Sequence, residues 1–482
     1  MGTNGRMTRQ VRLRRSGITV AAVLALVTGL AMNVSSASAV SLASIGALES
    51  AAPPLKRNVV QHPEPLTDMQ GWSAASDAGP TSLRSVALPA GSPAATAVEV
   101  ARPAGTGEWG MALASLHDPA ASFEVGRTYR MQMWVRDLRA SGEDVGLLLA
   151  NGNYDHRPVD ASVWGGYRDS AWHLLARTFV ARAPAAGDTS LYVALPSSGA
   201  LRWQFAGAQV GEVDAPEPAT VTGPATRTID FPGAAGAAPD ARIWNHEVGG
   251  SGWGNGELQT YTSSTRNASV DGAGRLRITA RRETLTGSDE ITRNYTSARL
   301  TTENKVVIAP GSYVEASIKA PTGAGVWPAF WLIGANHGTV GWPASGELDV
   351  LEGHGASPTD TFRAVHASSL SLPEQDNPFG WGDDGGRVDL GQPLDATFHT
   401  YGVYFDKDLV RFYVDRREVM SLWAADGAAN DRAWPFGKPQ YPILNVAVSD
   451  DPSATVFPRT MLVDNISIWS GGVPAAGTAA SG

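Results

Sequence analysis

The 482-residue chain has no cysteine, few charged residues and almost no helical periodicity. Without cysteine, it can form neither a disulfide framework nor a thiolate metal site. Only 18% of its residues are charged, and the near absence of a 3.6-residue apolar period argues against long amphipathic helices. Its 53 glycines and 31 prolines are typical of short strands joined by many turns. At this length, two or three globular domains are expected.

Long apolar runs are also missing, except near the N-terminus. There, the basic segment "MTRQVRLRRSG" precedes the apolar "ITVAAVLALVTGLAMNV" and the small-residue "SASAV". This order is that of an export signal, here cleaved after Ala39. An uncleaved anchor is the alternative, and the Arg14-Arg15 pair leaves twin-arginine export open. We expect residues 1–39 to be a signal peptide, and the mature protein to be secreted, extracellular and without a membrane partner.

Positive charge is scarce after this segment. Residues 1–39 carry five arginines and no acids, so their removal changes the formal charge from −9 to about −14. A surface of this charge repels nucleic acid and anionic polymers. The partner that we expect is therefore not a nucleic acid, whereas a neutral substrate is compatible with the charge.

Composition divides the remaining chain into two strand-rich regions. Residues 40–62 are rich in Ala, Ser and Pro, and predict a disordered linker. Residues 63–213 contain alternating segments such as "YRMQMWVRD", which predict an antiparallel β-sandwich. A Pro/Thr/Ala linker at 214–227 leads to a second strand-rich region at 228–470, and the tail 471–482 looks too small and polar to pack. The predicted fold class is therefore all-β, with two domains.

Three acids lie close together in the apolar segment "SGELDVLEGHG". The residues between Glu347, Asp349 and Glu352 are apolar, which indicates a buried or half-buried strand. In a regular strand Glu347 and Asp349 share one face, whereas Glu352 points to the other. A β-bulge between Asp349 and Glu352 would return Glu352 to the shared face. We predict that bulge.

With the bulge, Glu347 and Glu352 lie about 13 Å apart at their Cα atoms. By leaning together they can bring their carboxyl groups to about 5 to 5.5 Å, the spacing of a retaining glycosidase. One glutamate then attacks the anomeric carbon and the other protonates the leaving oxygen. Asp349, between them, can hydrogen-bond the nucleophile and raise the pKa of the acid. A calcium site or a hydrogen-bonded acidic strand is the alternative reading of this spacing.

Tryptophans surround the acidic segment in "GVWPAFWLIG", "GWPASGE" and "GGSGWGNGELQTYT". Sugar rings stack their apolar faces on aromatic side chains, while polar groups fix their hydroxyls. Trp342 precedes Glu347 by five residues, near enough to line the same site. Core packing is the alternative for each tryptophan, and Trp331, within an apolar run, is the best candidate for it.

The segments "WNHEVGGSGWGNGELQTYT", "YTSARLTT", "GVWPAFWLIG", "GELDVLEG", "YPILNVAV" and "MLVDNISIW" occur in the order found in glycoside hydrolase family 16. Residues 228–470 most resemble its bacterial endo-β-1,3-glucanases, or laminarinases. The resemblance implies a β-jelly-roll with a concave cleft, a retaining mechanism and an E-x-D-x-x-E motif. By it, Glu347 matches the nucleophile, Asp349 the assisting acid and Glu352 the acid/base.

The resemblance also implies residues that bind sugar or hold a metal. Trp342 matches the family's sugar-stacking residue, and Asn255, Arg299 and His366 match residues that bind sugar hydroxyls or the catalytic carboxylates. Glu257 and Trp327, from the tryptophan-rich segments, are the other candidate substrate-binding residues. No cofactor is required, but many members hold a structural calcium, for which Asp230 and Asp464 are the candidates here. The segment "IDFPG" puts Asp230 where the family usually has glutamate, and "SLSLPEQDNPFGWGDDGGR", after the catalytic strand, also departs from the family pattern.

The first domain resembles carbohydrate-binding modules of families 4 and 9, through "FEVGRTYRMQMWVRD", "AWHLLARTFVA" and "TSLYVAL". Trp109, Trp134, Trp164 and Trp172 include its candidate binding aromatics, with packing inside the sandwich as the alternative for each. Tethering such a module to an enzyme would raise the local concentration of enzyme at an insoluble polysaccharide.

The sequence therefore predicts a secreted, retaining endo-β-1,3-glucanase that acts on laminarin-like β-glucan, and we expect a monomer. Within the same fold, a β-1,3-1,4-glucanase, an agarase-like galactanase or a transglycosylase is the alternative. A glucan-binding protein without activity is a further class, but such relatives lack the catalytic glutamates that this chain keeps.

Overall fold

The computed structural model describes residues 53–64, 69–76, 81–103, 110–150, 162–181, 184–196, 199–380, 386–449 and 451–475. The predicted signal peptide lies outside these residues. In the described ranges no helix is long and apolar enough to cross a membrane. The helices there are short: α2 (Pro119–Ser122), α3 (His337–Val340), α4 (Ala424–Ala429) and the 3-10 turn η2 (Pro435–Gly437). The predicted all-β class is confirmed.

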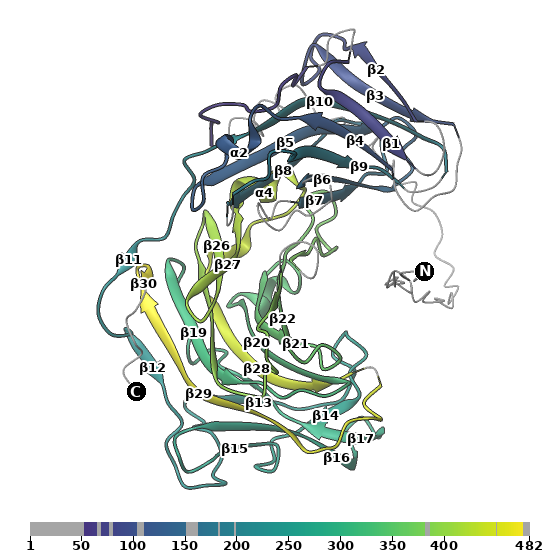
Figure 1. The fold of residues 1–482 in the computed structure, drawn as a ribbon. Coiled ribbons are helices and arrows are strands. Elements are labelled where there is room, and N and C mark those ends of the chain that lie inside the picture. The colour runs from purple at the N-terminus through teal and green to yellow at the C-terminus, as the bar shows by residue number, and fades with distance from the viewer. Residues whose placement is uncertain are drawn as a thin grey trace, which may run out of the picture. The chain divides into compact units, whose positions relative to one another are not determined.

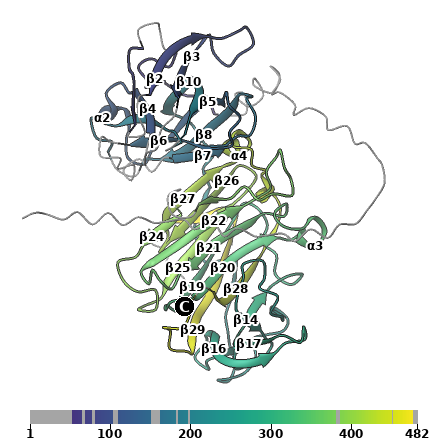
Figure 2. The ribbon, with the colours of Figure 1, turned by 90° about the vertical axis from the view of Figure 1, so that its right-hand side faces the viewer.

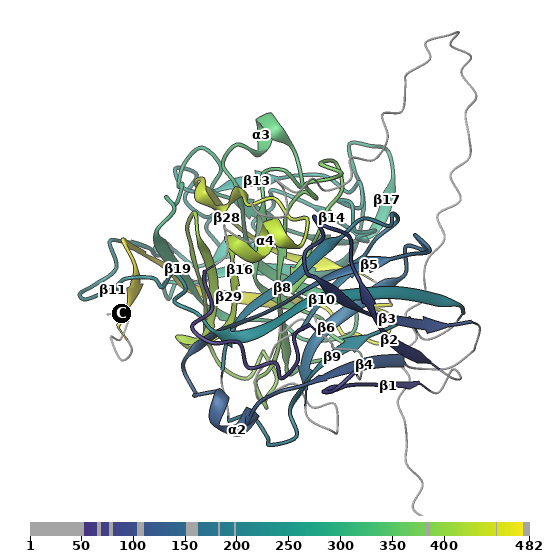
Figure 3. The same cartoon turned by 90° about the horizontal axis from the view of Figure 1, so that it is seen from above.

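The first region folds as a β-sandwich of two five-stranded antiparallel sheets, which can be followed in Figures 1 and 3. One sheet has the order β1 (Trp72–Ser76), β4 (Gly110–Ser115), β9 (Ser190–Ala194), β6 (Asp144–Ala150) and β7 (Ser162–Gly166). The other has the order β2 (Ser82–Ala87), β3 (Thr96–Arg102), β10 (Leu201–Glu212), β5 (Thr128–Asp137) and β8 (His173–Val180). Met131 and Met133 on β5 pack in its core with Leu147 of the facing sheet. The alternating pattern of the β5 segment therefore does mark a core strand.

The sandwich begins earlier than the sequence predicts. Leu55 bridges to Val213, and Val59 and Val60 are buried in the sandwich core. The prediction that 40–62 is wholly a disordered linker is therefore wrong for its last residues. These three apolar side chains gain burial free energy, which a reading of average composition overlooks.

The candidate aromatics of the sandwich divide by exposure. Trp134 and Trp172 are buried, whereas Trp164 on β7 is 47% exposed. The ring of Trp164 lies directly against Gly146 on β6, where a Cβ atom would be 2.7 Å from it. Trp109 lies outside the described residues. Among the three candidate tryptophans that the structure describes, Trp164 is therefore the one that presents a large aromatic surface to solvent.

The second region consists of two larger sheets (Figure 2). The ten-stranded sheet contains β14 (Gln259–Tyr261), β17 (Thr292–Ser297), β16 (Leu276–Thr286), β29 (Arg459–Ser470), β19 (Ser312–Lys319), β25 (His399–Phe405), β26 (Leu409–Val414) and β27 (Arg417–Trp423), with β12 (Arg227–Ile229) and β15 (Ala268–Val270) at its sides. The eight-stranded sheet contains β13 (Asn245–Glu247), β18 (Arg299–Thr301), β28 (Gln440–Val448), β20 (Val326–Gly334), β21 (Glu347–Gly353), β22 (Asp360–His366), β23 (Phe379–Gly380) and β24 (Arg387–Asp389).

A single apolar core joins the two sheets. It takes Ile278 and Val314 from the ten-stranded sheet, and Phe330, Leu348 and Leu444 from the eight-stranded sheet. Side chains alternate along a strand, so the neighbours of these residues on the eight-stranded sheet point away from the core. We call this outward-pointing surface of the eight-stranded sheet the site face.

The predicted linker 214–227 and tail 471–482 also contribute structure. β11 (Thr220–Val221) pairs in parallel with β30 (Val473–Pro474). The prediction of an unpacked tail is therefore wrong for its first residues. Backbone hydrogen bonds between two short segments need no apolar pattern, so composition carries no signal for this pair.

Candidate active site

The strand β21 contains the predicted bulge. Asp349 pairs with Ala364 and Glu352 with Phe362, so the segment between the two acids has one residue more than the partner strand. The register on the β20 side shifts at the same place. Val350 and Leu351 are both buried in the core, and Glu352 therefore returns to the face that Asp349 occupies. The prediction of a bulge between Asp349 and Glu352 is confirmed.

Cross-strand pairing brings the other candidates to the site face. Side chains directly opposite each other in neighbouring strands lie on the same face. Glu347 is opposite His366 on β22, Asp349 is opposite Trp331 on β20, and Arg299 is opposite Asn445 on β28. Residues from five strands thus meet around the bulge, where β20, β21 and β22 run side by side (Figure 2).

Each glutamate accepts a hydrogen bond from its own tryptophan. The indole Nε1 of Trp342 donates to Glu347 Oε2 at 2.9 Å, and that of Trp327 donates to Glu352 Oε1 at 2.9 Å. Trp342 is 50% exposed, whereas Glu352 is only 5% exposed. Glu352 Oε2 is buried and has no hydrogen-bond partner among the described residues. The two carboxylates therefore sit in different surroundings, one open on its indole side and one enclosed.

Burial dominates the electrostatics of both glutamates. Burial, together with the charge of Asp349, raises the pKa of Glu347 to about 8. Burial and then Asp349 also raise the pKa of Glu352 well above its usual range. Cationic His366 opposes the shift at both glutamates, whereas Arg299 opposes it at Glu347. Since a nearby positive charge favours a carboxylate, we expect Glu347 to ionise while Glu352 keeps its proton.

His366 stands beside Asp349. Its Nε2 lies 3.3 Å from Asp349 Oδ2, and its Nδ1 lies 2.6 Å from Asp376 Oδ2. The polar atoms of Glu347, Asp349 and His366 all lie within 4.8 Å of one another. The predicted candidate His366 is thus part of the acidic cluster, and Asp376 is a partner that the sequence did not reveal.

Arg299 is clamped between two aromatic rings. Its guanidinium carbon lies 4.7 Å from the ring centroid of Trp253 and 4.7 Å from that of Trp331, distances at which a cation is attracted to the ring face. It also forms an ion pair with Glu247. This arrangement fixes a positive charge near Glu347.

Trp331 is buried, as expected, with 9% exposure. It packs in an apolar cluster on the site face with Ala329, Ile333, Tyr441 and Ile443 rather than in the core between the sheets. The sequence did not indicate which face it occupies, because β20 is buried on both faces and its apolar run hides the alternation. The i, i+4 spacing of Trp327 and Trp331 was the available signal, since such residues share a strand face.

Asn255 and Glu257 lie in the loop before β14. The Asn255 amide donates to Glu257 Oε1 at 3.4 Å, and Gln259 donates to Glu257 Oε2 at 2.5 Å. Asn255 is exposed and Glu257 is buried. Their predicted contacts with sugar stay predictions. In the structure Glu257 holds groups of the protein itself.

The two calcium candidates, Asp230 and Asp464, lie near each other because β12 pairs with β29. Asp464 already has a cationic partner. Ile229 is opposite Ile466, so Asp230 follows close to residues 464 and 465. Asp464 Oδ1 lies 3.3 Å from Arg275 Nε. A calcium site gathers several oxygen ligands, and a guanidinium on one of them disfavours a second cation. The calcium stays a prediction.

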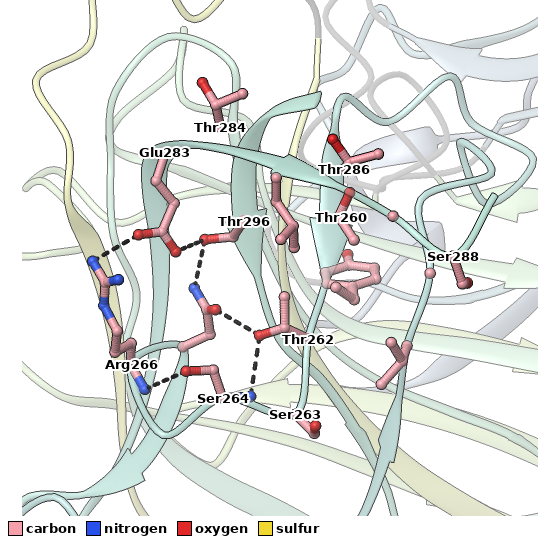
Figure 4. A pocket seen from close by; sticks show the side chains of 16 residues that line it. Thr260, Thr262, Ser263, Ser264, Arg266, Glu283, Thr284, Thr286, Ser288 and Thr296 are labelled. Carbon is pink, nitrogen blue, oxygen red and sulfur yellow. Dashed lines mark hydrogen bonds and ion pairs between the residues drawn. The ribbon is translucent and has the colours of Figure 1, made fainter. Parts of the chain in front are cut away.

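A polar pocket of about 700 Å³ lies apart from the acids, on β14, β16, β17 and their loops (Figure 4). Nine of the sixteen residues that line it carry a hydroxyl group. Glu283 accepts a hydrogen bond from Thr296 at 2.5 Å and forms an ion pair with Arg266 at 2.7 Å. Its charged groups therefore satisfy each other, and we assign no function to it.

Comparisons with known proteins indicate the family of this chain. A family model described as Glycosyl hydrolases family 16 matches residues 256–455. The chain is 33% identical over 245 residues to a beta-glucanase of Rhodothermus marinus, covering 48% of this chain and 80% of that protein. It is 32% identical over 256 residues to glucan endo-1,3-beta-glucosidase A1 of Niallia circulans, covering 48% of this chain but only 36% of that protein.

Among solved structures, an endo-beta-1,3-glucanase from Pyrococcus furiosus is similar, with 34% identity and a TM-score of 0.46. The match covers 53% of this chain and 98% of that one. The chain belongs to glycoside hydrolase family 16, and it is a glycoside hydrolase with a laminarinase-like catalytic domain.

Proposed function

We propose that this protein is a secreted endo-β-1,3-glucanase that hydrolyses laminarin-like glucan with retention of configuration. The observation that carries the proposal is the bulge in β21, which turns Glu347, Asp349 and Glu352 to one face. The beta-glucanase and endo-1,3-beta-glucosidase relatives support the choice of substrate.

In the first step the ionised form of Glu347, which two neighbouring cations favour, attacks the anomeric carbon and the glycosidic bond breaks. Glu352 gives its proton to the leaving oxygen, and its partner-free Oε2 is suited to face that oxygen. In the second step Glu352 takes a proton from water, which displaces Glu347 from the sugar. Asp349 raises the pKa of Glu352, which keeps the acid protonated before the first step.

Substitution of either glutamate by glutamine tests these roles. We expect Glu352→Gln to lower kcat on laminarin by about 10²- to 10⁴-fold, the usual contribution of a positioned acid/base, and Glu347→Gln to lower it at least as much. Glucan binding should persist in both. The exposed Glu374→Gln provides a control with the same chemical change, and substantial turnover by a pure Glu347→Gln variant would remove it from the nucleophile role.

Linkage and stereochemistry are separate questions. Reducing-sugar release from laminarin, lichenan and agarose distinguishes the β-1,3-glucanase from the β-1,3-1,4-glucanase and galactanase alternatives. NMR of the first products reports the anomeric configuration, and longer oligosaccharides among them would indicate transglycosylation. A protein that binds these glucans and cleaves none would be a glucan-binding protein, as the name of a relative suggests, the beta-1,3-glucan-binding protein of Penaeus monodon.

We further propose that the N-terminal sandwich binds polysaccharide through Trp164. Its ring is half exposed and lies close against Gly146, which holds it in place as a surface on which a sugar ring can stack. The proposal concerns this domain alone and is independent of catalysis.

A further inference from the structure

The loop at residues 368–378 follows β22 and belongs to the segment that departs from the family pattern. It carries Asp376, whose Oδ2 lies 2.6 Å from His366 Nδ1. The other ring nitrogen of His366 lies 3.3 Å from Asp349 Oδ2. The imidazole therefore lies between two carboxylates, one from the acidic strand and one from the loop.

The loop is held firmly by its own contacts. Ser368 and Asp376 form an antiparallel bridge, and the Asn377 backbone N–H donates to Ala367 O at 2.8 Å. Asp376 is thereby tied to the backbone just after β22, two residues beyond His366. Its carboxylate is 17% exposed, so its contact with the imidazole is partly shielded from water.

A second set of contacts anchors the loop to the segment after α4. Asp431 accepts hydrogen bonds from the side chains of Ser369 at 2.5 Å and Ser371 at 2.7 Å. Arg432 donates to the Asn377 backbone oxygen at 2.6 Å. Anchors on both arms of the loop leave Asp376 little freedom to leave His366, so its carboxylate is placed before any substrate binds.

We propose that Asp376 is a positioning residue for hydrolysis: through His366 it keeps a positive charge beside Asp349 and Glu347, and so keeps the nucleophile ionised. The inference rests on the catalytic roles proposed above. A neutral imidazole has no charge and one N–H for one carboxylate, whereas an imidazolium is attracted by its charge to both carboxylates, which lie 2.6 Å and 3.3 Å from its two nitrogens. The second carboxylate therefore selects the charged form.

The surroundings of His366 agree with this role. Asp349 and Glu347 face it from β21 and Asp376 from the loop, and the Trp342 ring centroid is 6.0 Å away. Burial alone would lower the pKa of His366, but contacts with Asp349 and Asp376 outweigh burial and raise that pKa to about 11. The resulting cation lowers the pKa of Glu347 against the repulsion of Asp349.

The test is Asp376→Asn, which keeps the shape and one acceptor oxygen but removes the charge. We expect the acidic limb of the kcat/KM profile on laminarin to move to higher pH by about one unit, the lower end of the effect of one close charge. Below that limb kcat/KM then falls about ten-fold, while at alkaline pH it approaches that of the wild-type enzyme. KM should change by less than about two-fold, because Asp376 acts through His366 rather than on sugar.

Glu374→Gln, an exposed acid of the same loop, is the matched control and should leave the profile unchanged. Asp376→Glu keeps the negative charge, so the acidic limb of its kcat/KM profile should lie closer to the wild-type position than that of Asp376→Asn. A loss for Asp376→Asn that is equal at every pH would show structural damage instead, and would overturn the proposal.

An independent measurement needs no enzymatic activity. Histidine ¹⁵N NMR should find both ring nitrogens of His366 protonated from about pH 5 to 9, far above the usual range of histidine. In Asp376→Asn the imidazolium should lose its proton at lower pH. Titration of wild-type His366 near its ordinary value would refute the role of Asp376. An enzyme without activity on any glucan would refute the proposed function and leave this measurement standing.

Discussion

The two indole donors make it possible to assign the glutamates separately. Trp327 donates to Glu352 and Trp342 donates to Glu347, each at 2.9 Å. Replacement of either tryptophan by phenylalanine removes the N–H and keeps a ring. Because a donor stabilises the ionised carboxylate, its loss raises the pKa of the glutamate that it contacts.

The sign of the effect differs between the two limbs of the pH profile. Glu352 must be protonated for the first step, so a higher pKa of Glu352 moves the alkaline limb to higher pH. Glu347 must be ionised, so a higher pKa of Glu347 moves the acidic limb to higher pH. Trp327→Phe should therefore widen the active range, and Trp342→Phe should narrow it.

The magnitudes follow from burial. A hydrogen bond to a charged group contributes about 1.5 to 3 kcal/mol, and one pKa unit corresponds to about 1.36 kcal/mol. Loss of the enclosed Trp327 donor should thus move the alkaline limb by about one to two units. Trp342 is half exposed, and water can replace its donor, so we expect a shift of about half a unit or less in the acidic limb.

The assay is the kcat/KM profile on laminarin, which reports groups of the free enzyme. Coupled carboxylates titrate as a pair, so the informative quantity is the difference between the two variants. Trp434→Phe is a control, because its indole donates to the Asp406 backbone oxygen at 3.1 Å instead of to an acid of the site. If Trp342→Phe moved only the alkaline limb, the assigned roles would be reversed. If both limbs moved equally in both variants, the proposal that each tryptophan controls the pKa of its own glutamate would be refuted.

Two further predictions concern stability and binding. Burial raises the pKa of Glu352 in the folded protein. Above the pKa of an unfolded glutamate, near 4.3, the folded protein therefore binds more protons than the unfolded chain. Its free energy of unfolding then falls as the pH rises toward the folded-state pKa of Glu352. Calorimetry should therefore find a higher Tm for Glu352→Gln than for the wild-type protein at pH 8, by about 2 to 4 °C for each kcal/mol of stability gained. This gain should vanish near pH 4. An equal gain at both pH values would show that the raised pKa of Glu352 is not its cause. In pull-down assays, Trp164→Ala should no longer be retained on insoluble β-1,3-glucan, while its activity on soluble laminarin stays unchanged. The control Val125→Ala, at another exposed side chain of the sandwich, should bind as the wild-type protein does. Unchanged retention of Trp164→Ala would exclude Trp164 as the binding surface.

The arrangement of the acidic strand could be predicted because its sequence imposes two requirements that a regular strand cannot meet together. Apolar residues between the acids require one buried face, and the odd spacing of Glu347 and Glu352 is incompatible with a regular strand. A bulge is the local structure that satisfies both, and the register of β21 contains it. The spacing of about 5 to 5.5 Å between the two carboxyl groups stays a prediction.

Other features could not be predicted, for physical reasons. Asp376 lies ten residues from His366 in a loop without periodicity, and its placement depends on Asp431 and Arg432, whose contacts with the loop span more than fifty positions. Trp331 lies in a strand whose two faces are both apolar, so hydrophobicity alone cannot tell core from site. Loop anchors and double-sided burial are properties of the assembled fold rather than of a local pattern.

The short parallel pair of β11 and β30 has a practical consequence for dissecting the protein. A recombinant catalytic domain cut at residues 228 and 470, as composition suggests, would lose both strands and uncover the Trp469 indole, which donates to Gly223 at 3.3 Å. Boundaries near 219 and 475 would retain the pair. Purification tags fused directly after Ser470 would meet the same difficulty, so an affinity handle belongs beyond residue 475.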